Sequence, residues 1–373
     1  MNKLARLLVA AGESSPDMRY AAGFSTPDDF IWFDTGEERA VVMSPLEYNR
    51  AVTSVRRGTR VFAESELGGP GRLRVLKTIC ERYQLDGFET PENFPLGLAD
   101  ALRNAGLTVT ACAGEFFPER EFKSESEVAA ITKALRSAET GARRAVDVLR
   151  ESGIDAERNL VWHGSPLTSE VLRAEIDCAM LRCGALPTGT ICAGGIQASQ
   201  PHHTGSGVLR ADAPIVMDIF PRSAVTGYWG DLTRTVIRGR PTPVMLRAYD
   251  AVLEARELGK RLIVRGAIPA EIHLAAAELL KRRGFSTGRG PEGEYGFFHG
   301  LGHGVGLDIH EAPRLSPRSS EPLRGGEIIT VEPGLYYPEW GGIRLEDLVY
   351  LPKEGMHRTL TELEDFFVID GND

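Results

Sequence analysis

The sequence predicts two domains: a mixed α/β domain over residues 1–120, and an α+β domain over residues 123–373 in which helices flank a largely antiparallel sheet. The chain has 373 residues, enough for two cores, and its 42% hydrophobic and 25% charged content is ordinary for a globular protein. Short strand-like runs alternate with helical patterns in the first part, whereas long helical patterns accompany strands in the second.

The first domain is predicted from apolar runs bounded by turn residues. Four strands are expected, at residues 7–11, 28–33, 39–44 and 59–64. Two helical patterns follow, at residues 71–83 and 94–106, and the second ends at a glycine suited to a C-cap. This part contains no cluster of histidines and acidic residues, so no chemistry is predicted for it.

The second domain begins with a long helix. Ser124 and Glu127 have the spacing of a capping box, and apolar residues then recur at three- and four-residue steps until Gly153 stops the helix. The later elements are predicted from periodicity and from proline and glycine positions. Helices are expected at residues 168–183, 243–266 and 269–284, and strands at residues 213–220, 226–239, 326–334 and 343–352.

Composition argues against several classes of function. A net charge of −9, without a basic cluster interleaved with aromatic residues, opposes nucleic-acid binding. No apolar run approaches the ~20 residues that span a bilayer, and the run LLVAA (7–11) is shorter than the core of a signal peptide. Five cysteines without a C-x-x-C pair favour reduced thiols. We therefore expect a cytoplasmic protein that binds neither nucleic acid nor membrane.

Five side chains of the metal-ligand type recur in strand-like or glycine-rich contexts: Asp218, Asp231, His303, Glu332 and Glu346. Four carboxylates and one imidazole suit a pair of oxygen-preferring divalent cations better than a thiolate-rich zinc. Two carboxylates about 4 Å apart repel by roughly 4 kcal/mol at an effective dielectric near 20. A domain whose free energy of unfolding is about 5–15 kcal/mol cannot tolerate several such repulsive pairs. If these residues converge, they must hold metal or protons.

The two aspartates lie on predicted adjacent strands joined by the turn-rich segment PRSAVTG. Residues directly opposed on antiparallel strands have Cβ atoms about 4.5–5.5 Å apart, so Asp218 and Asp231 could share a cation. The alternative for Asp218 is a buried ion pair with Arg234.

His299 and His303 are four residues apart, which could mimic a helical metal-binding pair. Four glycines between positions 300 and 306 would cost a helix about 4 kcal/mol relative to alanine. The segment is therefore expected to be extended or irregular, so that only one of the two histidines touches metal.

The segments that carry these residues are DIFPRSAVTGYWGDLTRT, HGLGHGVGLDIHE, VEPGLY and GIRLED. Through them, residues 123–370 resemble the "pita-bread" metallopeptidases of family M24, most closely the Xaa-Pro branch of aminopeptidase P and prolidase. The N-terminal third resembles the small creatinase N-terminal-like α/β domain of that branch. The resemblance implies a curved antiparallel sheet flanked by helices. It also implies a dinuclear-metal peptidase that hydrolyses the Xaa-Pro bond of short peptides through a metal-bridging hydroxide.

The resemblance implies a role for each metal-ligand residue. Asp218 would chelate one ion, Asp231 and Glu346 would bridge both, and His303 and Glu332 would complete the ligand shells. Glu332 would also accept and return a proton. Oxygen-rich ligation favours Mn²⁺, with Co²⁺ or Zn²⁺ as alternatives.

Other residues would contact the substrate. His202 would lie near the scissile amide, with His203 as the second candidate, and His299 would shape the substrate pocket. His310 would donate a hydrogen bond to the tetrahedral intermediate, and Arg344 would support the site or face the substrate. Short proline-containing peptides and a second copy of the chain, in a homodimer, are the expected partners.

An X-Pro bond lacks the amide N–H and restricts the backbone, so a dedicated pocket needs apolar walls. Candidates, which could equally lie in the core, are Phe297, Phe298, Tyr336, Tyr337 and Trp340.

One feature departs from the family pattern: the twelve residues between Asp218 and Asp231 exceed the common connection by two. An even extension at a hairpin tip keeps both side chains on one face.

Three rival functions stay open. A creatinase-like hydrolase of a non-peptide C–N bond and a non-enzymatic binding protein are opposed by the complete ligand set. A methionine aminopeptidase is opposed by the predicted N-terminal domain.

Overall fold

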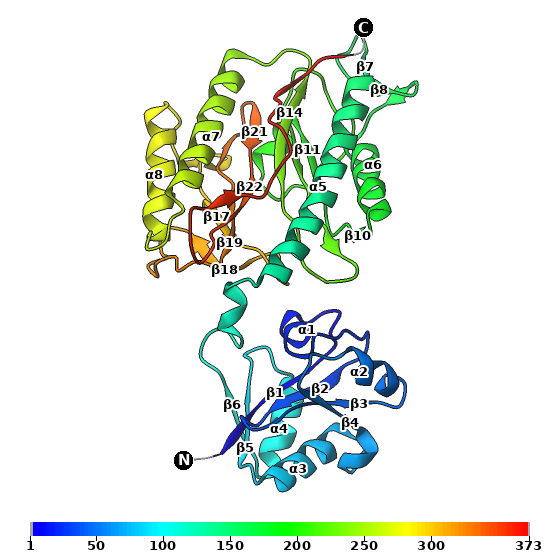
Figure 1. Cartoon of the computed structure of the whole chain (residues 1–373). Coiled ribbons are helices and arrows are strands. Elements are labelled where there is room, and N and C mark those ends of the chain that lie inside the picture. Colours follow the sequence, from blue (N-terminus) through cyan, green and yellow to red (C-terminus); the bar gives the residue numbers. More distant parts are fainter. Residues whose placement is uncertain (1–2, 372–373) are drawn as a thin grey trace. The chain divides into compact units, whose positions relative to one another are not determined.

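The structure, a computed structural model, describes residues 3–371. The chain separates into two compact units, one ending at Arg120 and one beginning at Glu121 (Figure 1). None of the described helices is long and apolar enough to cross a membrane.

The first unit is built around a six-stranded mixed sheet of order β4-β3-β2-β1-β5-β6. Only β2 runs antiparallel to both neighbours, and the other pairs are parallel. The strands are β1 (Leu4–Ala10), β2 (Phe30–Asp34), β3 (Arg39–Met43), β4 (Thr59–Ala63), β5 (Gly87–Thr90) and β6 (Thr108–Ala111). The helices are α1 (Pro16–Ala22), α2 (Tyr48–Ser54), η1 (Glu64–Leu67), α3 (Arg72–Tyr83) and α4 (Leu96–Asn104).

Four strands and two helices of this unit were predicted, whereas β5, β6, α1 and α2 were not. The missed strands have four residues each and the missed helices seven. Elements this short complete too few periods to give a clear sequence signal.

The second unit carries four long helices: α5 (Glu125–Glu151), α6 (Ser169–Arg182), α7 (Pro243–Leu262) and α8 (Pro269–Arg282), preceded by η2 (Pro118–Glu121). The predicted capping box begins α5, where the Ser124 N–H donates to Glu127 Oε2 at 2.8 Å. The apolar stripe of α5 is buried against α6 and the strands. In Figure 1, α5 and α6 lie on one side of this unit and α7 and α8 on the other, with strands between the two pairs.

The strands of the second unit form two principal sheets. One has the order β11-β12-β14-β24, with β11 (Ile191–Gly194), β12 (Ile215–Asp218), β14 (Thr233–Arg238) and β24 (Val368–Ile369). The other has the order β18-β17-β19-β22-β23, with β17 (Gly302–Gly304), β18 (Glu311–Leu315), β19 (Ile328–Val331), β22 (Asp347–Tyr350) and β23 (Arg358–Thr359). Apart from the β14–β24 pair, the pairing is antiparallel.

Shorter elements complete this unit. The hairpin β20 (Gly334–Tyr337) and β21 (Gly341–Arg344) lies between β19 and β22 in the chain. The remaining elements are β7 (Gly153–Ile154), β8 (Leu160–Trp162), β9 (Ser165–Pro166), β10 (Ala185–Leu186), η3 (Gly195–Ser199), β13 (Arg222–Ser223), β15 (Gly288–Gly290) and β16 (Gly293–Tyr295).

Hydrogen bonds join β14 of the first principal sheet to the hairpin and to the residues that lead into β22. Thr235 Oγ1 donates to the Arg344 carbonyl of β21 at 2.8 Å, and the Glu346 N–H donates to the Thr233 carbonyl at 3.0 Å. These bonds bring residues of the first sheet beside the segment that enters the second.

The connection between the two aspartates forms the predicted hairpin, although its regular strands are shorter than the predicted ranges 213–220 and 226–239. Beyond β12 and β14, the Ile219 N–H donates to the Leu232 carbonyl at 2.9 Å, Arg222 is paired with Trp229, and the Ser223 N–H donates to the Tyr228 carbonyl at 2.9 Å. Near its tip the hairpin gains a further partner, because β13 also pairs antiparallel with β10.

Candidate functional site

The second unit contains a cavity of about 1000 Å³. All nine residues to which the sequence assigned a site role line it: Asp218, Asp231, His303, Glu332, Glu346, His202, His299, His310 and Arg344. They come from separate stretches of the chain, so the fold places them around a single space.

The register of the strands places Asp218 and Asp231 on the same face of the sheet. Asp218 ends β12 and is paired with Thr233 of β14. Asp231 lies two residues before Thr233, and side chains two residues apart along an extended chain point to the same face. Even spacing thus keeps both carboxylates at the cavity, although Asp231 lies ahead of the strand and not within it.

The second sheet supplies the other three residues. His303 is the middle residue of β17, Glu332 follows β19 directly, and Glu346 stands between β21 and β22. The glycine-rich segment around His303 is a strand and not a helix, as predicted. Extra side chains would not fit there, because a Cβ atom on Gly302 would lie 1.9 Å from the Thr330 carbonyl oxygen.

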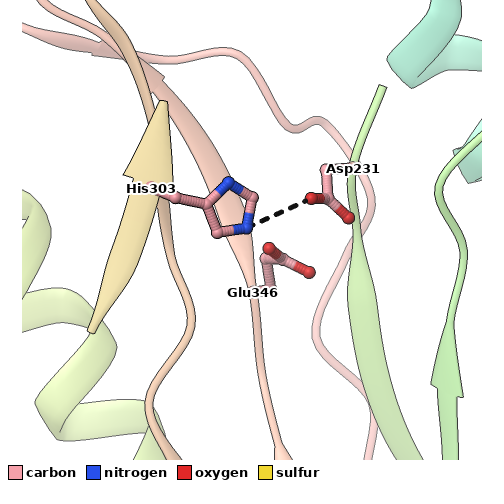
Figure 2. Close-up of side chains that lie close together, drawn as sticks. All are labelled: Asp231, His303 and Glu346. Carbon is pink, nitrogen blue, oxygen red and sulfur yellow. Dashed lines mark ion pairs between the residues drawn. The ribbon is translucent and has the colours of Figure 1, made fainter. Parts of the chain in front are cut away.

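Asp231, His303 and Glu346 form the tightest group. Each offers one ligand atom, and these atoms lie within 4.8 Å of one another (Figure 2). His303 Nε2 is 3.7 Å from Asp231 Oδ2 and 3.4 Å from Glu332 Oε1. The three side chains are almost fully buried, with exposed fractions of 4%, 5% and 2%. Asp218 and Glu332 line the same cavity beside this group.

Burial shifts the pKa of each acid in the group. Loss of solvation raises the pKa of Asp231 and of Glu346 well above the ordinary range, and the neighbouring carboxylates raise both further. Burial, aided by the charge of Asp218, likewise raises the pKa of Glu332 to about 7 despite the opposing charge of Arg344. The acids therefore favour protons when no cation balances them.

His303 is held as a neutral imidazole. Burial, aided by His310, lowers its pKa to about 3. Its Nδ1 lies 3.2 Å from the Gly304 carbonyl, which can only accept, so Nδ1 carries the proton and Nε2 has a free lone pair. That lone pair faces Asp231 and Glu332, which is the orientation a metal ligand needs.

Threonine hydroxyls fix the ligand geometry. Thr233 Oγ1 donates to Glu346 Oε2 at 2.8 Å, and the His303 N–H donates to Thr330 Oγ1 at 3.0 Å. Thr233 and Thr330 are completely buried, so these bonds are shielded from water. Sequence reasoning missed both threonines, because a threonine inside a strand is ordinary.

Asp218 forms an ion pair, but with a different arginine from the one considered as the alternative. Arg344 Nη2 donates to Asp218 Oδ2 at 2.6 Å, with the arginine 3% exposed. Arg234 points to the opposite face of β14 and pairs with Asp347 at 3.0 Å. The Arg234 alternative is therefore wrong, because neighbouring residues of a strand face opposite ways.

His299 is turned away from the acids. Its Nδ1 donates to the Gly300 carbonyl at 2.7 Å, so its Nε2 accepts from the Tyr336 hydroxyl at 3.0 Å. Arg344 Nη1 also donates to this hydroxyl, at 3.0 Å. Burial lowers the pKa of His299 to about 3, which keeps the ring neutral.

The other histidines lie toward the open part of the cavity. The His310 ring meets the His303 ring edge to face, with centroids 4.3 Å apart. His202 is exposed, whereas His203 Nδ1 accepts from the Gly205 N–H at 2.9 Å and is folded into its own turn. This leaves His202 the freer of the two to reach a ligand.

One cation of the cavity was not anticipated. Arg314 of β18 is exposed, lines the cavity and is paired in register with His303, so its side chain points to the same face. In the sequence it stands among other surface-type charges, and nothing local distinguishes it from Arg318.

Of the aromatic residues proposed as pocket walls, Phe298 and Tyr336 line the cavity, Phe297 lies in the core, and Tyr337 stacks on Trp340.

Known proteins resemble this chain, one of them over nearly its whole length. The Xaa-Pro dipeptidase of Pyrococcus horikoshii is 29% identical over 97% of this chain and 95% of its own. The Xaa-Pro dipeptidase of Pyrococcus furiosus is 32% identical over 66% of this chain and 65% of its own.

Solved structures match the fold. The prolidase of P. horikoshii superposes with a TM-score of 0.81 at 26% identity, covering 97% of this chain and 94% of that one. The X-Pro aminopeptidase of Thermotoga maritima gives 0.82 at 25% identity, covering 98% and 97%. The predicted fold class, a mixed α/β unit followed by a pita-bread unit, is confirmed.

The sequence pattern of metallopeptidase family M24 matches residues 107–353, a range that includes the cavity and all nine residues discussed above. The family resemblance predicted from four short motifs is therefore confirmed, and the chain belongs to metallopeptidase family M24.

Proposed function

We propose that this chain is a metal-dependent peptidase that hydrolyses the Xaa-Pro bond of short peptides, using two divalent cations. The observation that carries the proposal is the buried group of Asp231, His303 and Glu346, with Asp218 and Glu332 beside it around one cavity. The relatives named Xaa-Pro dipeptidase support the choice of bond. The homodimer and the cytoplasmic location stay predictions.

The donor set fits divalent cations. Asp218, Asp231, His303, Glu332 and Glu346 would hold them, and their oxygen-rich chemistry favours Mn²⁺ over Co²⁺ or Zn²⁺. The raised pKa values of the buried acids support this assignment, since bound cations would stabilise the charged carboxylates that burial and mutual repulsion disfavour. When bound, such ions lower the pKa of a coordinated water toward neutrality and polarise a carbonyl group.

The protein supplies proton transfer and charge stabilisation. Glu332, whose pKa is about 7 without metal, can take a proton from the attacking water and deliver it to the departing proline nitrogen. His310, beside His303, can donate a hydrogen bond to the oxyanion that develops on the carbonyl oxygen. His202 would contact the substrate near the scissile amide, and His299 with Phe298 would form a pocket wall.

Arg314 favours a dipeptide over a longer peptide. It is exposed at the cavity, whereas Arg344 is buried and bound to Asp218. A guanidinium in this position can bind the free carboxylate of a C-terminal proline through paired hydrogen bonds. A longer peptide would place a neutral amide there, so we propose Xaa-Pro dipeptidase activity as the principal function.

Hydrolysis of Gly-Pro and of an Xaa-Pro-Xaa tripeptide, with and without Mn²⁺, tests the proposal directly. We expect Mn²⁺-dependent release of proline from Gly-Pro, and slower cleavage of the tripeptide. If the metal-replete protein cleaves neither peptide, the creatinase-like or binding-protein alternatives become the better account.

Replacing His310 by alanine should leave folding intact and reduce kcat by about 10²–10³, because one donor to the oxyanion is lost. Steady-state kinetics on Gly-Pro, together with the thermal unfolding midpoint, provide the measurement. His357→Ala is the control, since that histidine lies between β22 and β23 and should leave kcat unchanged. Unchanged turnover in His310→Ala would remove His310 from the mechanism.

Replacing Arg314 by glutamine should raise KM for Gly-Pro about 10- to 100-fold, the equivalent of a charged hydrogen bond worth about 1.5–3 kcal/mol. The prolinamide analogue Gly-Pro-NH₂, which lacks the carboxylate, should show almost no change in KM. Arg318→Gln provides a matched control from the same segment. If Arg314→Gln raises KM equally for Gly-Pro and for Gly-Pro-NH₂, then Arg314 does not bind the substrate carboxylate.

Removing metal should make stability depend on pH. An acid whose pKa is raised by folding stabilises the protein below its ordinary pKa, and this stability is lost as pH rises through the raised value. Glu332 therefore loses its contribution as pH rises from its ordinary pKa through about 7, while the histidines with lowered pKa, which take up protons only in the unfolded state, change stability in the opposite direction. The unfolding temperature of the EDTA-treated parent should therefore fall between pH 5 and pH 8 relative to that of Glu332→Gln, which keeps the same histidines.

Glu332→Gln is the reference for this measurement, because it removes one titrating acid and keeps the histidines, so the difference between the two proteins reports Glu332. A difference in unfolding temperature that stays constant between pH 5 and pH 8 in EDTA, or that changes in favour of the parent, would contradict the raised pKa of Glu332.

A further inference from the structure

A second group of charges lies on the opposite face of the strands that carry the ligands. We call it the back-face cluster, and its members are Arg234, Arg256, Lys260, Asp347 and Asp365. Asp347 accepts from Arg234 Nη2 at 3.0 Å and from Lys260 Nζ at 2.9 Å, and it forms an ion pair with Arg256, whose Nε lies 3.3 Å from Asp347 Oδ2. Both arginine side chains are only 2% exposed.

The cluster stays ionised although it is buried. Burial alone would raise the pKa of Asp347, but the charges of Arg234, Arg256 and Lys260 lower it below its ordinary value. Buried ion pairs of this kind contribute little net stability, since the cost of desolvation offsets the attraction. Their best-attested use is to fix one geometry among several, which raises the question of what geometry this cluster fixes.

Strand alternation connects the cluster to the ligands. Glu346 lines the cavity and Thr233, paired in register with Asp218, donates to it from the same side, whereas the residues that follow them, Arg234 and Asp347, face the other way. A change in the back-face cluster therefore acts on the same two peptide segments that present the Glu346 carboxylate and the Thr233 hydroxyl.

Arg234 reaches the main chain of the ligand segment itself. Its Nη1 donates to the Glu346 carbonyl at 2.7 Å and to the Thr233 carbonyl at 3.0 Å. The Glu346 N–H also donates to the Thr233 carbonyl, at 3.0 Å. Glu346 belongs to neither β21 nor β22, so these bonds fix both of its backbone polar groups where no strand ladder does.

The C-terminal segment holds Arg234 in turn. Its Nη2 donates to the Leu363 carbonyl at 2.9 Å, and its Nε lies 3.4 Å from Asp365 Oδ1. Arg256 shares both acidic partners, with Nη1 donating to Asp365 at 2.8 Å. Among its hydrogen bonds in the described part of the chain, however, none goes to Glu346 or Thr233.

We propose that Arg234 is a positioning residue for the metal site: it fixes the peptide group of Glu346 so that the carboxylate points at the cations, and it links that group to residues 363–365. The inference rests on the proposed role of Glu346 as a ligand. It adds a residue that contacts neither the cavity nor a substrate, yet sets the affinity for metal.

Mn²⁺ titration of metal-stripped protein by calorimetry tests the inference, with Arg234→Lys as the variant and Arg256→Lys as the matched control. Both changes keep the positive charge in the same buried cluster, so both should lower the unfolding temperature. Only Arg234→Lys loses the forked contact to Glu346 and Thr233. Its Mn²⁺ affinity should fall about 10- to 100-fold, which is the usual effect of losing a group that orients a ligand. The Mn²⁺ affinity of Arg256→Lys should stay close to that of the parent protein.

The outcomes separate the two proposals. A parent protein that binds no Mn²⁺ defeats the proposed function. A parent that binds Mn²⁺, with Arg234→Lys binding equally well, or with both variants weakened equally, overturns the role of Arg234 alone.

A second route applies if Arg234→Lys does not fold. Arg234→Gln leaves Asp347 with Lys260 and Arg256 as partners, and should weaken Mn²⁺ binding similarly.

Hydrogen exchange on the parent protein tests the inference without any variant. Because Arg234 links the site to the C-terminal segment, Mn²⁺ should slow exchange in peptides over residues 360–366. Unchanged exchange in these peptides would contradict the inference.

Discussion

The mutual repulsion of buried carboxylates governs this site. Asp231 and Glu346 are almost fully buried and lie within ligand distance of His303, with Glu332 beside them. At an effective dielectric near 20, two such charges about 4 Å apart cost roughly 4 kcal/mol. Arg344 balances Asp218 directly, at 2.6 Å, but the remaining acids require protons or added cations. The raised pKa values express this requirement, and metal binding is its chemical solution in a family M24 protein.

The fold brings the acids together by linking β14 to the segment around Arg344 and Glu346. The candidate ligands come from both principal sheets and their connections, and Thr233 and Thr235 of β14 hydrogen-bond to the chain around Glu346 and Arg344. Side chains of alternating orientation then give the strands two functions. One face presents the acids to the cavity, and the other carries a buried cluster of opposite charges that fixes the backbone.

Main-chain carbonyls determine which ring nitrogen of His303 and of His299 carries the proton. Gly304 and Gly300 accept from Nδ1 of His303 and His299, which leaves each Nε2 with its lone pair free to accept. For His303 the lone pair meets the acidic group, and for His299 it meets the Tyr336 hydroxyl. Two histidines four residues apart therefore have different chemistry, because the chain between them is extended and turns their rings in different directions.

The sequence alone determined the local features and the family. Helix α5 begins at its capping box, a glycine-rich segment excluded a helix around His303, and four motifs with the family resemblance they carry identified nine residues that line one cavity. These inferences succeeded because caps, periodicity and glycine content act over a few neighbouring residues. Tertiary structure alone decided that Asp218 pairs with Arg344, that Arg314 faces the cavity, and that β13 of the expected hairpin also pairs with β10. Such contacts join residues far apart in the chain, and their partners depend on sheet register and on which face each side chain occupies, which no local pattern specifies.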